Sequence, residues 1–546
     1  MNRLVALLLA VPLGAVAFAQ ANTDPEIDVL LGEMDDLEAV GRQGAFPNGV
    51  NGCVFATTAC NAGTKVIQWR APMNPDHPFI AFLVARERNG RFEQISDRSY
   101  VKHGFFALSS NFCGPCTSPG DPALLGIGCS DTYSVNSNGN QLYLGPPEEI
   151  DPWLGLWDPT CSHFDRGEPP VAPPADCNGQ RSLNAAQVAA LGPVAHRILL
   201  QDADLNQAGT FWFQAQYVLR SEGEGARANN LASHEFVPVW TGSAWNLIER
   251  NPILFPTLYG SVLRRWSGAS VTSATNGTDD GRLYVAVKVT GPDPASGFHH
   301  YEYALHNRDN RRGVGSLRIP VCSGARVRNL GFGDIDEQVA NDWSAGVAAG
   351  EIVFSTSTNP LAWNTIFNFW FDSDAAPAAG TLALGQSARG AGLDTVAVAS
   401  SAPLELFNLA LGPGCALDTP PTLFAVGAPP RAALGNATFA LRSTGNAALR
   451  PSWLRYSIVP GSFQQGPCTR YLGPGPGLSF AAGMRLTDAA GVVEHPLPVP
   501  NDLALEGLAL SLQTISRDPG HGILRGNFEL SEGLRVRIGN LLPGCP

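Results

Sequence analysis

The chain has 546 residues, which is more than a single hydrophobic core usually accommodates, so two or three domains are expected. Its 59 glycines and 43 prolines disfavour long helices and predict a mainly β protein. A formal charge of −12, with only 15% charged residues and no clustered basic stripe, argues against nucleic acid as a partner.

The N-terminus has the pattern of a secretory signal peptide. Arg3 precedes an apolar run over residues 4–18, and Ala17-Phe18-Ala19 forms a small-residue cleavage signal before Gln20. The run is too short to span a bilayer, and no later stretch approaches about 20 consecutive apolar residues, so no transmembrane segment is expected. The sequence predicts a signal peptide at 1–19 and a secreted protein, located outside the cell, at its surface or in the periplasm.

Eleven cysteines in an exported chain predict a disulfide framework. They crowd the loop-rich region 44–177, where disulfides are expected to replace part of a hydrophobic core. The odd total leaves at least one thiol unpaired within the chain. Cys322 lies far from the other cysteines in sequence. Cys468 can pair with either Cys415 or Cys545. The disulfide candidates are Cys53, Cys60, Cys113, Cys116, Cys129, Cys161, Cys177, Cys415, Cys468 and Cys545.

One cysteine pair has the spacing of a redox motif. Cys113-Gly114-Pro115-Cys116 matches thioredoxin-like oxidoreductases, in which the first thiolate lies at a helix N-terminus. Residues 117–122 contain two prolines that cannot continue a helix, and no βαβ pattern flanks the motif. Structural disulfides are therefore expected here, with disulfide oxidoreductase activity as an alternative.

A possible calcium loop begins at Asp202. Asp202, Asp204 and Asn206 place three oxygen-bearing side chains at alternate positions, as calcium loops do. The sixth position is Gln207 rather than glycine, and the twelfth is Phe213 rather than glutamate. Calcium binding is one hypothesis for this segment, and turn-forming aspartates are the other.

Strand signals strengthen between 197 and 374, with runs at 210–219, 282–289, 301–305 and 365–371. The last run is apolar on both faces, which is typical of a strand buried between two layers. Prolines at 168–174 suggest either a boundary near 168–180 or a long surface loop. Small residues at 375–402 precede a new set of short strands. We predict a large β-sandwich-like domain at 20–402 and a smaller C-terminal antiparallel β-sandwich at 403–546.

The strongest metal hypothesis concerns His300, Glu302 and His306, which point to one side of a predicted strand. His300 and Glu302, about 7 Å apart along the backbone, can converge on zinc, copper or iron with a ligand from a neighbouring strand. His306 is too distant to share that ion unless the strand bulges. The alternative is a solvated polar face. Further histidines are available elsewhere in the chain: His103, His163, His196 and His234.

A carbohydrate or another cell-surface ligand is also considered. Four tryptophans supply the aromatic rings that a sugar-stacking platform needs, although core packing explains the same residues. They are Trp153, Trp157, Trp212 and Trp370.

Three stretches resemble a group of large secreted bacterial proteins. They are Lys102-His103-Gly104-Phe105-Phe106-Ala107-Leu108, Tyr301-Glu302-Tyr303-Ala304-Leu305-His306-Asn307 and Trp363-Asn364-Thr365-Ile366-Phe367-Asn368-Phe369. Separately, Leu497-Pro498-Val499-Pro500-Asn501-Asp502 is similar to a C-terminal β-domain attached to many exported proteins of such bacteria. The resemblance implies an exported β-protein and no particular reaction, catalytic residue or cofactor.

The leading hypothesis is a secreted or cell-surface β-rich protein that acts as a binding or structural component. Its first rival is an extracellular metal-dependent enzyme that uses His300 and Glu302. The second is a disulfide oxidoreductase that uses Cys113 and Cys116. The cofactors considered are calcium and a transition metal.

Overall fold

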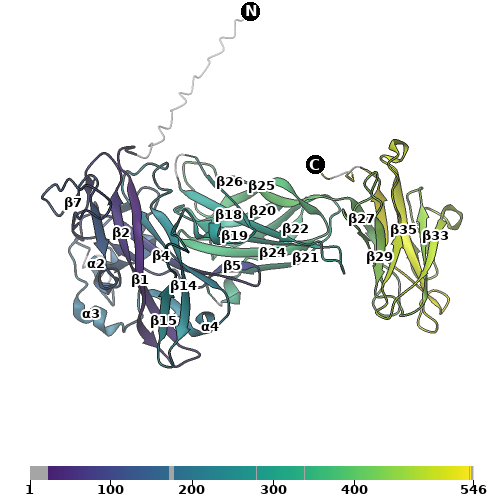
Figure 1. The fold of residues 1–546 in the computed structure, drawn as a ribbon, viewed down its shortest axis with the longest axis horizontal. Coiled ribbons are helices and arrows are strands. Elements are labelled where there is room, and N and C mark those ends of the chain that lie inside the picture. Colours follow the sequence, from purple (N-terminus) through teal and green to yellow (C-terminus); the bar gives the residue numbers. More distant parts are fainter. Residues whose placement is uncertain are drawn as a thin grey trace, which may run out of the picture.

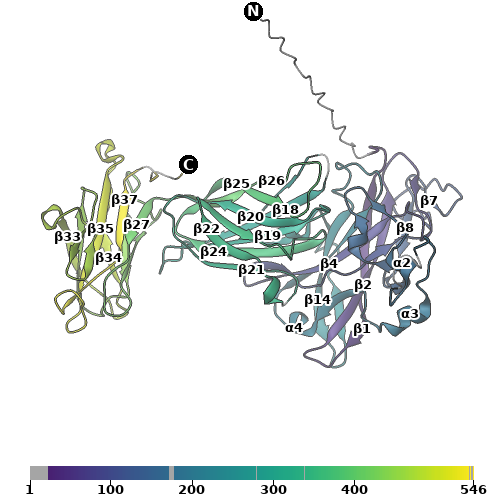
Figure 2. The same ribbon diagram turned by 180° about the vertical axis from the view of Figure 1, so that it is seen from behind.

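The computed structural model describes residues 23–170, 177–277, 280–336, 338–539, 541–542 and 545. The expected signal peptide at 1–19 lies outside these residues. The mainly β fold is confirmed, with many antiparallel sheets. Three β bodies lie in a row along the long axis of the molecule (Figure 1), and the view from behind shows the same order (Figure 2). We name them the N-terminal domain (23–269), the middle domain (270–406) and the C-terminal domain (407–545).

The N-terminal domain packs two sheets around one core. The smaller sheet contains β1 (Val29–Gln43), β2 (Val50–Asn61), β12 (Ile198–Gln201) and β8 (Ser130–Tyr133). The larger contains β15 (Trp245–Glu249), β14 (Leu231–Trp240), β13 (Thr210–Val218), β4 (Phe79–Arg88), β6 (Val101–His103), β9 (Leu144–Gly145), β16 (Leu258–Tyr259) and β5 (Arg91–Gln94). Phe55 bridges the layers, with its ring centroid 4.9 Å from that of Phe82 and 4.8 Å from that of Phe213.

Short ladders and helices fill the connections of this domain. The ladders are β3 (Ile67–Gln68) with β7 (Leu124–Leu125), and β10 (Ile150–Asp151) with β11 (Leu156–Trp157). The α-helices are α1 (Val135–Asn138), α2 (His163–Arg166), α3 (Ala185–Ala190) and α4 (Asp202–Leu205). Because β12 pairs with β2, opposing Ile198 to Cys53, segments that precede and follow 168–180 in sequence share one sheet and one core. The sheets change between Trp266 and β17, where we divide the first two domains.

The middle domain is a sandwich of two five-stranded sheets. One contains β17 (Ser270–Thr275), β18 (Arg282–Thr290), β19 (His299–Asn307), β24 (Thr365–Ser373) and β21 (Val327–Gly333). The other contains β22 (Ser344–Ala348), β23 (Glu351–Ser355), β20 (Val314–Pro320), β25 (Ala376–Gln386) and β26 (Thr395–Glu405). Phe367, Phe369 and Phe371 of β24 enter the core between them. On its other face, Ile366 packs against the N-terminal domain, so the doubly apolar strand is covered on both sides.

The C-terminal domain has a six-stranded and a three-stranded sheet. The first contains β27 (Asn408–Gly412), β37 (Gly533–Arg537), β35 (Ala509–Arg517), β30 (Pro451–Ser457), β33 (Phe480–Leu486) and β36 (Phe528–Leu530). The second contains β28 (Thr422–Val426), β29 (Ala440–Thr444) and β34 (Val493–Pro496), and β31 (Phe463–Gln465) pairs with β32 (Cys468–Arg470). The chain leaves the middle sandwich at Glu405 and enters this domain at Asn408.

Five disulfides link ten of the eleven cysteines: Cys60–Cys113, Cys116–Cys129, Cys161–Cys177, Cys322–Cys545 and Cys415–Cys468. One expectation was wrong. Cys53, a disulfide candidate, is a buried free thiol because its strand lies inside the N-terminal core. Cys322, which stands apart in sequence, pairs with Cys545 because the chain end returns to the middle domain. Such a framework is typical of proteins that fold in an oxidising, extracellular compartment.

Within the described part of the chain, no helix has the length and apolar character needed to cross a membrane.

Candidate functional site

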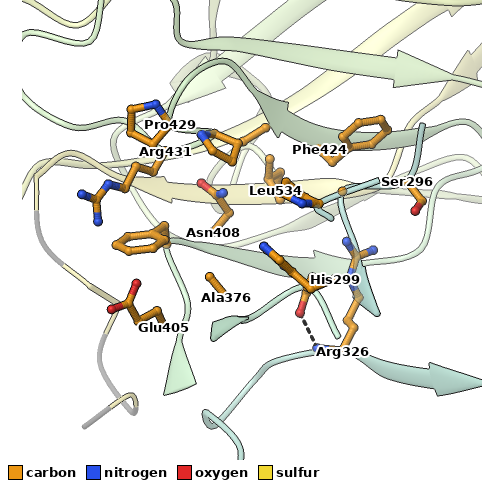
Figure 3. A pocket seen from close by; sticks show the side chains of 16 residues that line it. Ser296, His299, Arg326, Ala376, Glu405, Asn408, Phe424, Pro429, Arg431 and Leu534 are labelled. Atoms are coloured by element: carbon orange, nitrogen blue, oxygen red, sulfur yellow. Dashed lines mark hydrogen bonds and ion pairs between the residues drawn. The ribbon is translucent and has the colours of Figure 1, made fainter. Parts of the chain in front are cut away.

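A cavity of about 270 Å³ lies where the middle and C-terminal domains meet (Figure 3). The middle domain contributes His299 from the start of β19 and Glu405 from the end of β26. The C-terminal domain contributes Asn408 from β27, Phe424 from β28 and Arg431 from the loop after β28. Because both domains supply walls, the cavity exists only when they are held together.

Three contacts fix the relative position of the two domains. The Arg326 guanidinium bonds to Asp374 at 2.8 Å in the middle domain and to Glu532 at 2.9 Å in the C-terminal domain. The Cys322–Cys545 disulfide joins the same two domains covalently. Gly297 has φ +76°, and a Cβ there would lie 3.3 Å from Phe424, so glycine allows the close approach. These contacts hold the cavity walls in place.

The cavity wall carries polar atoms that the protein leaves unpaired. Among the described residues, His299 Nδ1, Asn408 Oδ1 and Arg431 Nε are buried without a hydrogen-bond partner. Each unpaired buried polar atom costs about 1–3 kcal/mol. Burial lowers the pKa of His299, so its ring is neutral at physiological pH. These atoms have almost no accessible surface, so the side chains must turn toward the cavity before a ligand or water can pair with them.

Apolar groups lie beside these polar atoms. The Arg431 guanidinium stands 4.6 Å from the centroid of the Phe407 ring, and Phe424 forms another wall. Burial raises the pKa of Asp374, although its ion pair with Arg326 opposes that rise. Because Arg326 forms ion pairs with both Asp374 and Glu532, its role here is to join the two domains. The cavity thus combines aromatic faces with neutral and charged hydrogen-bonding groups.

The structure brings His300 and Glu302 together but commits both to other contacts. His300 Nε2 lies 3.0 Å from Glu302 Oε2, and His300 Nδ1 lies 2.8 Å from Asp372 Oδ1. Glu302 also forms an ion pair of 2.5 Å with Arg91 of the N-terminal domain. With both ring nitrogens occupied and the carboxylate shared with a guanidinium, this is an ion-pair network at a domain interface. The expected solvated face is wrong for Glu302, which is buried.

His306 does not join this pair. Six residues separate it from His300, which corresponds to about 20 Å along a regular strand. Its Nδ1 bonds to Ser261 Oγ at 2.8 Å, in the contact with the N-terminal domain. The other histidines considered have partners of their own. His103 Nδ1 lies 3.0 Å from His77 Nε2, the rings of His163 and His196 lie 5.3 Å apart, and His234 Nε2 lies 2.8 Å from the Arg250 carbonyl oxygen.

The calcium hypothesis at Asp202, Asp204 and Asn206 is not supported by the geometry. Asp202 and Asp204 lie in the single turn of α4, where residues two apart point in different directions. Asp202 bonds to Arg42, and Asp204 lies 3.4 Å from Arg86. Asn206 caps the turn through its backbone amide. Each aspartate is thus paired with a different arginine instead of sharing an ion.

The geometry supports neither the redox hypothesis nor the sugar-platform hypothesis. Cys113 and Cys116 belong to separate disulfides, with Cys60 and Cys129, so the motif holds no dithiol pair. Trp153, Trp157 and Trp212 are buried. Trp370 lies under the Arg91 guanidinium, 3.6 Å from its ring centroid. None of the four therefore offers a free face to a sugar.

The residues of the cavity were not identified from the sequence. His299 directly precedes the metal candidate His300, but Asn408 and Arg431 lie more than a hundred residues further on and carry no motif. The only available signal was the domain boundary predicted at 403, because ligand sites often lie at domain interfaces.

No family model and no curated protein matches the sequence. Among solved structures, the BcpA major pilin subunit of Bacillus cereus shares 8% identity with a TM-score of 0.18, over 63% of this chain and 84% of that one. Escherichia coli alpha-2-macroglobulin activated by porcine elastase shares 8% identity with a TM-score of 0.15, over 93% of this chain and 35% of that one. Such low TM-scores transfer neither fold nor function.

Proposed function

We propose that this extracellular β-rich protein is a binding protein that holds a neutral sugar in the cavity between its middle and C-terminal domains. The observation that carries the proposal is a cavity between two domains whose lining residues His299, Asn408 and Arg431 each hold a buried polar atom with no hydrogen-bond partner in the described part of the chain. Sugars carry hydroxyl groups that both donate and accept hydrogen bonds, so they can pair with atoms of both kinds.

The size and the lining of the cavity support a sugar of a single ring. Ligand pockets usually enclose about 300–1,000 Å³, so a volume of about 270 Å³ suits a small ligand. The Phe407 and Phe424 rings offer apolar surface for the C–H face of a sugar. Arg431 and Glu405 have opposite charges, so the lining favours neither an anion nor a cation strongly.

The test is calorimetric titration of the whole protein with glucose, galactose and N-acetylglucosamine, with galacturonate as the charged comparison. We expect at least one neutral sugar to bind. Asn408→Ala should weaken that binding at least tenfold, because one hydrogen bond to a buried acceptor is worth about 1.4 kcal/mol. Arg431→Met keeps the apolar stem of the side chain and should have a similar effect.

Asn246→Ala is the matched control, because Asn246 is exposed on β15 of the N-terminal domain. It should leave the affinity unchanged. Binding of galacturonate alone would contradict the neutral-sugar assignment. Failure of all four sugars to bind, or equal affinity in Asn408→Ala and wild type, would reject the cavity as their site and leave a structural junction as its role.

A further inference from the structure

A second group of side chains lies in the N-terminal domain, distant in sequence from the cavity residues. His163 is the first residue of α2, Glu168 follows that helix, and His196 lies in the loop before β12. One ligand atom from each lies within 4.8 Å of the others. His163 Nδ1 is 3.9 Å from Glu168 Oε2, and the two imidazole centroids are 5.3 Å apart.

These separations are close to those around a bound metal ion. Zinc bonds of about 2.0–2.1 Å in tetrahedral geometry place two ligand atoms about 3.3–3.4 Å apart. His163 Nδ1 and Glu168 Oε2 must therefore approach by about 0.5 Å, which small side-chain rotations can supply. Two imidazoles and one carboxylate form a ligand set that zinc accepts and that calcium, which prefers oxygen, does not.

The segment that carries His163 and Glu168 is held rigidly. Ser162 Oγ accepts a hydrogen bond from the Asp165 amide and caps α2. Asp165 Oδ2 accepts from the amides of Cys161 at 2.7 Å and Gly179 at 2.9 Å, and the Cys161–Cys177 disulfide closes the same loop. A separate contact positions the first ligand, since the His163 amide donates to Glu149 Oε1 at 2.7 Å. The backbone of this segment is thus fixed before any ion binds.

The His196 ring is also held in place. Gln141 donates from its side-chain amide to the carbonyl oxygens of Ala195 at 2.8 Å and Gly192 at 2.9 Å. The Tyr100 ring stacks on His196, with centroids 4.0 Å apart and planes within 11°. His196 has φ +64°, an unfavourable conformation that residues with a side chain adopt mainly at functional sites and tight turns.

Both imidazoles remain available for an ion. Nδ1 of His163, the ring nitrogen that faces Glu168, lies 3.9 Å from Glu168 Oε2, and Nδ1 of His196 is buried without a hydrogen-bond partner among the described residues. His300 differs in this respect, because carboxylates occupy both of its ring nitrogens.

We propose that His163, Glu168 and His196 bind one divalent transition-metal ion, with zinc as the best match, and that water takes the fourth position. Three protein ligands with one open position are typical of zinc sites that act on a bound water or substrate, whereas structural sites have four protein ligands. The site is independent of the sugar cavity, so either proposal can fail without the other.

The test is titration of the chelator-treated whole protein with Zn²⁺ by calorimetry, and with Co²⁺ by visible absorption, which reports four-coordinate geometry. We expect one ion per chain. His163→Gln, His196→Gln and Glu168→Gln should each weaken binding at least about 100-fold, since loss even of a residue that only supports a ligand costs 10–100-fold. Near-ultraviolet circular dichroism checks that each variant is folded, and Glu168→Gln, on a partly exposed side chain, is the least disruptive of the three.

Two further histidine variants distinguish this site from others. His521→Gln is the matched control on an exposed loop of the C-terminal domain, and it should leave the affinity unchanged. His300→Gln should also leave it unchanged. Loss of binding in His300→Gln, full binding in a folded Glu168→Gln variant, or no binding by the wild-type protein would overturn the proposal.

Discussion

Removal of the Cys322–Cys545 disulfide should loosen the C-terminal domain selectively. The bond closes a loop of 223 residues and joins the end of the chain to the middle domain. The chain-entropy relation gives about 5 kcal/mol for a loop of this length, and measured losses of native disulfides are about 2–5 kcal/mol. We therefore expect the double variant Cys322→Ala/Cys545→Ala to unfold its C-terminal domain at a lower temperature.

The size of the shift follows from the length of the domain. Roughly 135 residues, at about 2.1 cal/mol/K of unfolding entropy per residue, convert 2–5 kcal/mol into a decrease in Tm of about 7–17 °C. Hydrogen–deuterium exchange over a temperature series measures it, because peptides from β30 and β35 report on this domain and peptides from β19 on the middle domain. Calorimetry of the same samples gives the transition temperatures.

Cys53→Ala is the control, since Cys53 forms no disulfide and lies in the N-terminal core. It should leave exchange in β30 and β35 unchanged. The reasoning is refuted if the double variant and the wild type unfold β30 and β35 within about 1 °C of each other. Detection of free thiols at Cys322 and Cys545 in the native wild-type protein would refute the pairing itself.

Three further predictions concern single side-chain substitutions. The hydrogen bond to Glu302, with a smaller contribution from Asp372, raises the pKa of His300. Protonated His300 therefore stabilises the fold fully at pH values below its unfolded-state pKa of 6.5, and this stabilisation is lost as pH rises through its folded-state pKa. The difference in urea midpoint between wild type and His300→Gln should thus shrink from about pH 5.5 to pH 8.5, and a growing difference would contradict this. Asp202→Asn should lower the free energy of urea unfolding by about 2–4 kcal/mol, because Asp202 is buried and bonded to Arg42. Asp204→Asn, on a partly exposed side chain, should lower it by under about 1 kcal/mol. Equal losses of stability in the two variants would be inconsistent with this difference in burial. Phe369→Ala should lower the free energy of unfolding of the middle domain by about 3–5 kcal/mol, because the Phe369 ring packs 5.0 Å from that of Trp343 and 5.2 Å from that of Phe354. A loss of stability below about 1 kcal/mol would show that Phe369 does not belong to the core.

Local sequence patterns determined the type of structure. The abundance of glycine and proline predicted the β fold, and apolar residues on both faces of 365–371 predicted a strand buried between layers, because side-chain direction in a strand depends only on position along it. The spacing of the cysteines left Cys415 and Cys545 open as partners of Cys468, and the structure pairs Cys468 with Cys415. The pattern could not show that the outer face of β24 packs on another domain, because that depends on a distant part of the chain.

Tertiary structure alone decided which distant side chains meet. The pairing of Cys322 with Cys545, the cavity shared by His299 and Asn408, and the group containing His163 and His196 all join segments with no common motif. The physical reason is that the position of a side chain within a strand or turn is set locally, whereas its neighbours are set by the path of the whole chain. His300 and Glu302 illustrate this, because the predicted contact forms while Arg91 and Asp372, from other strands, turn it into an ion-pair network.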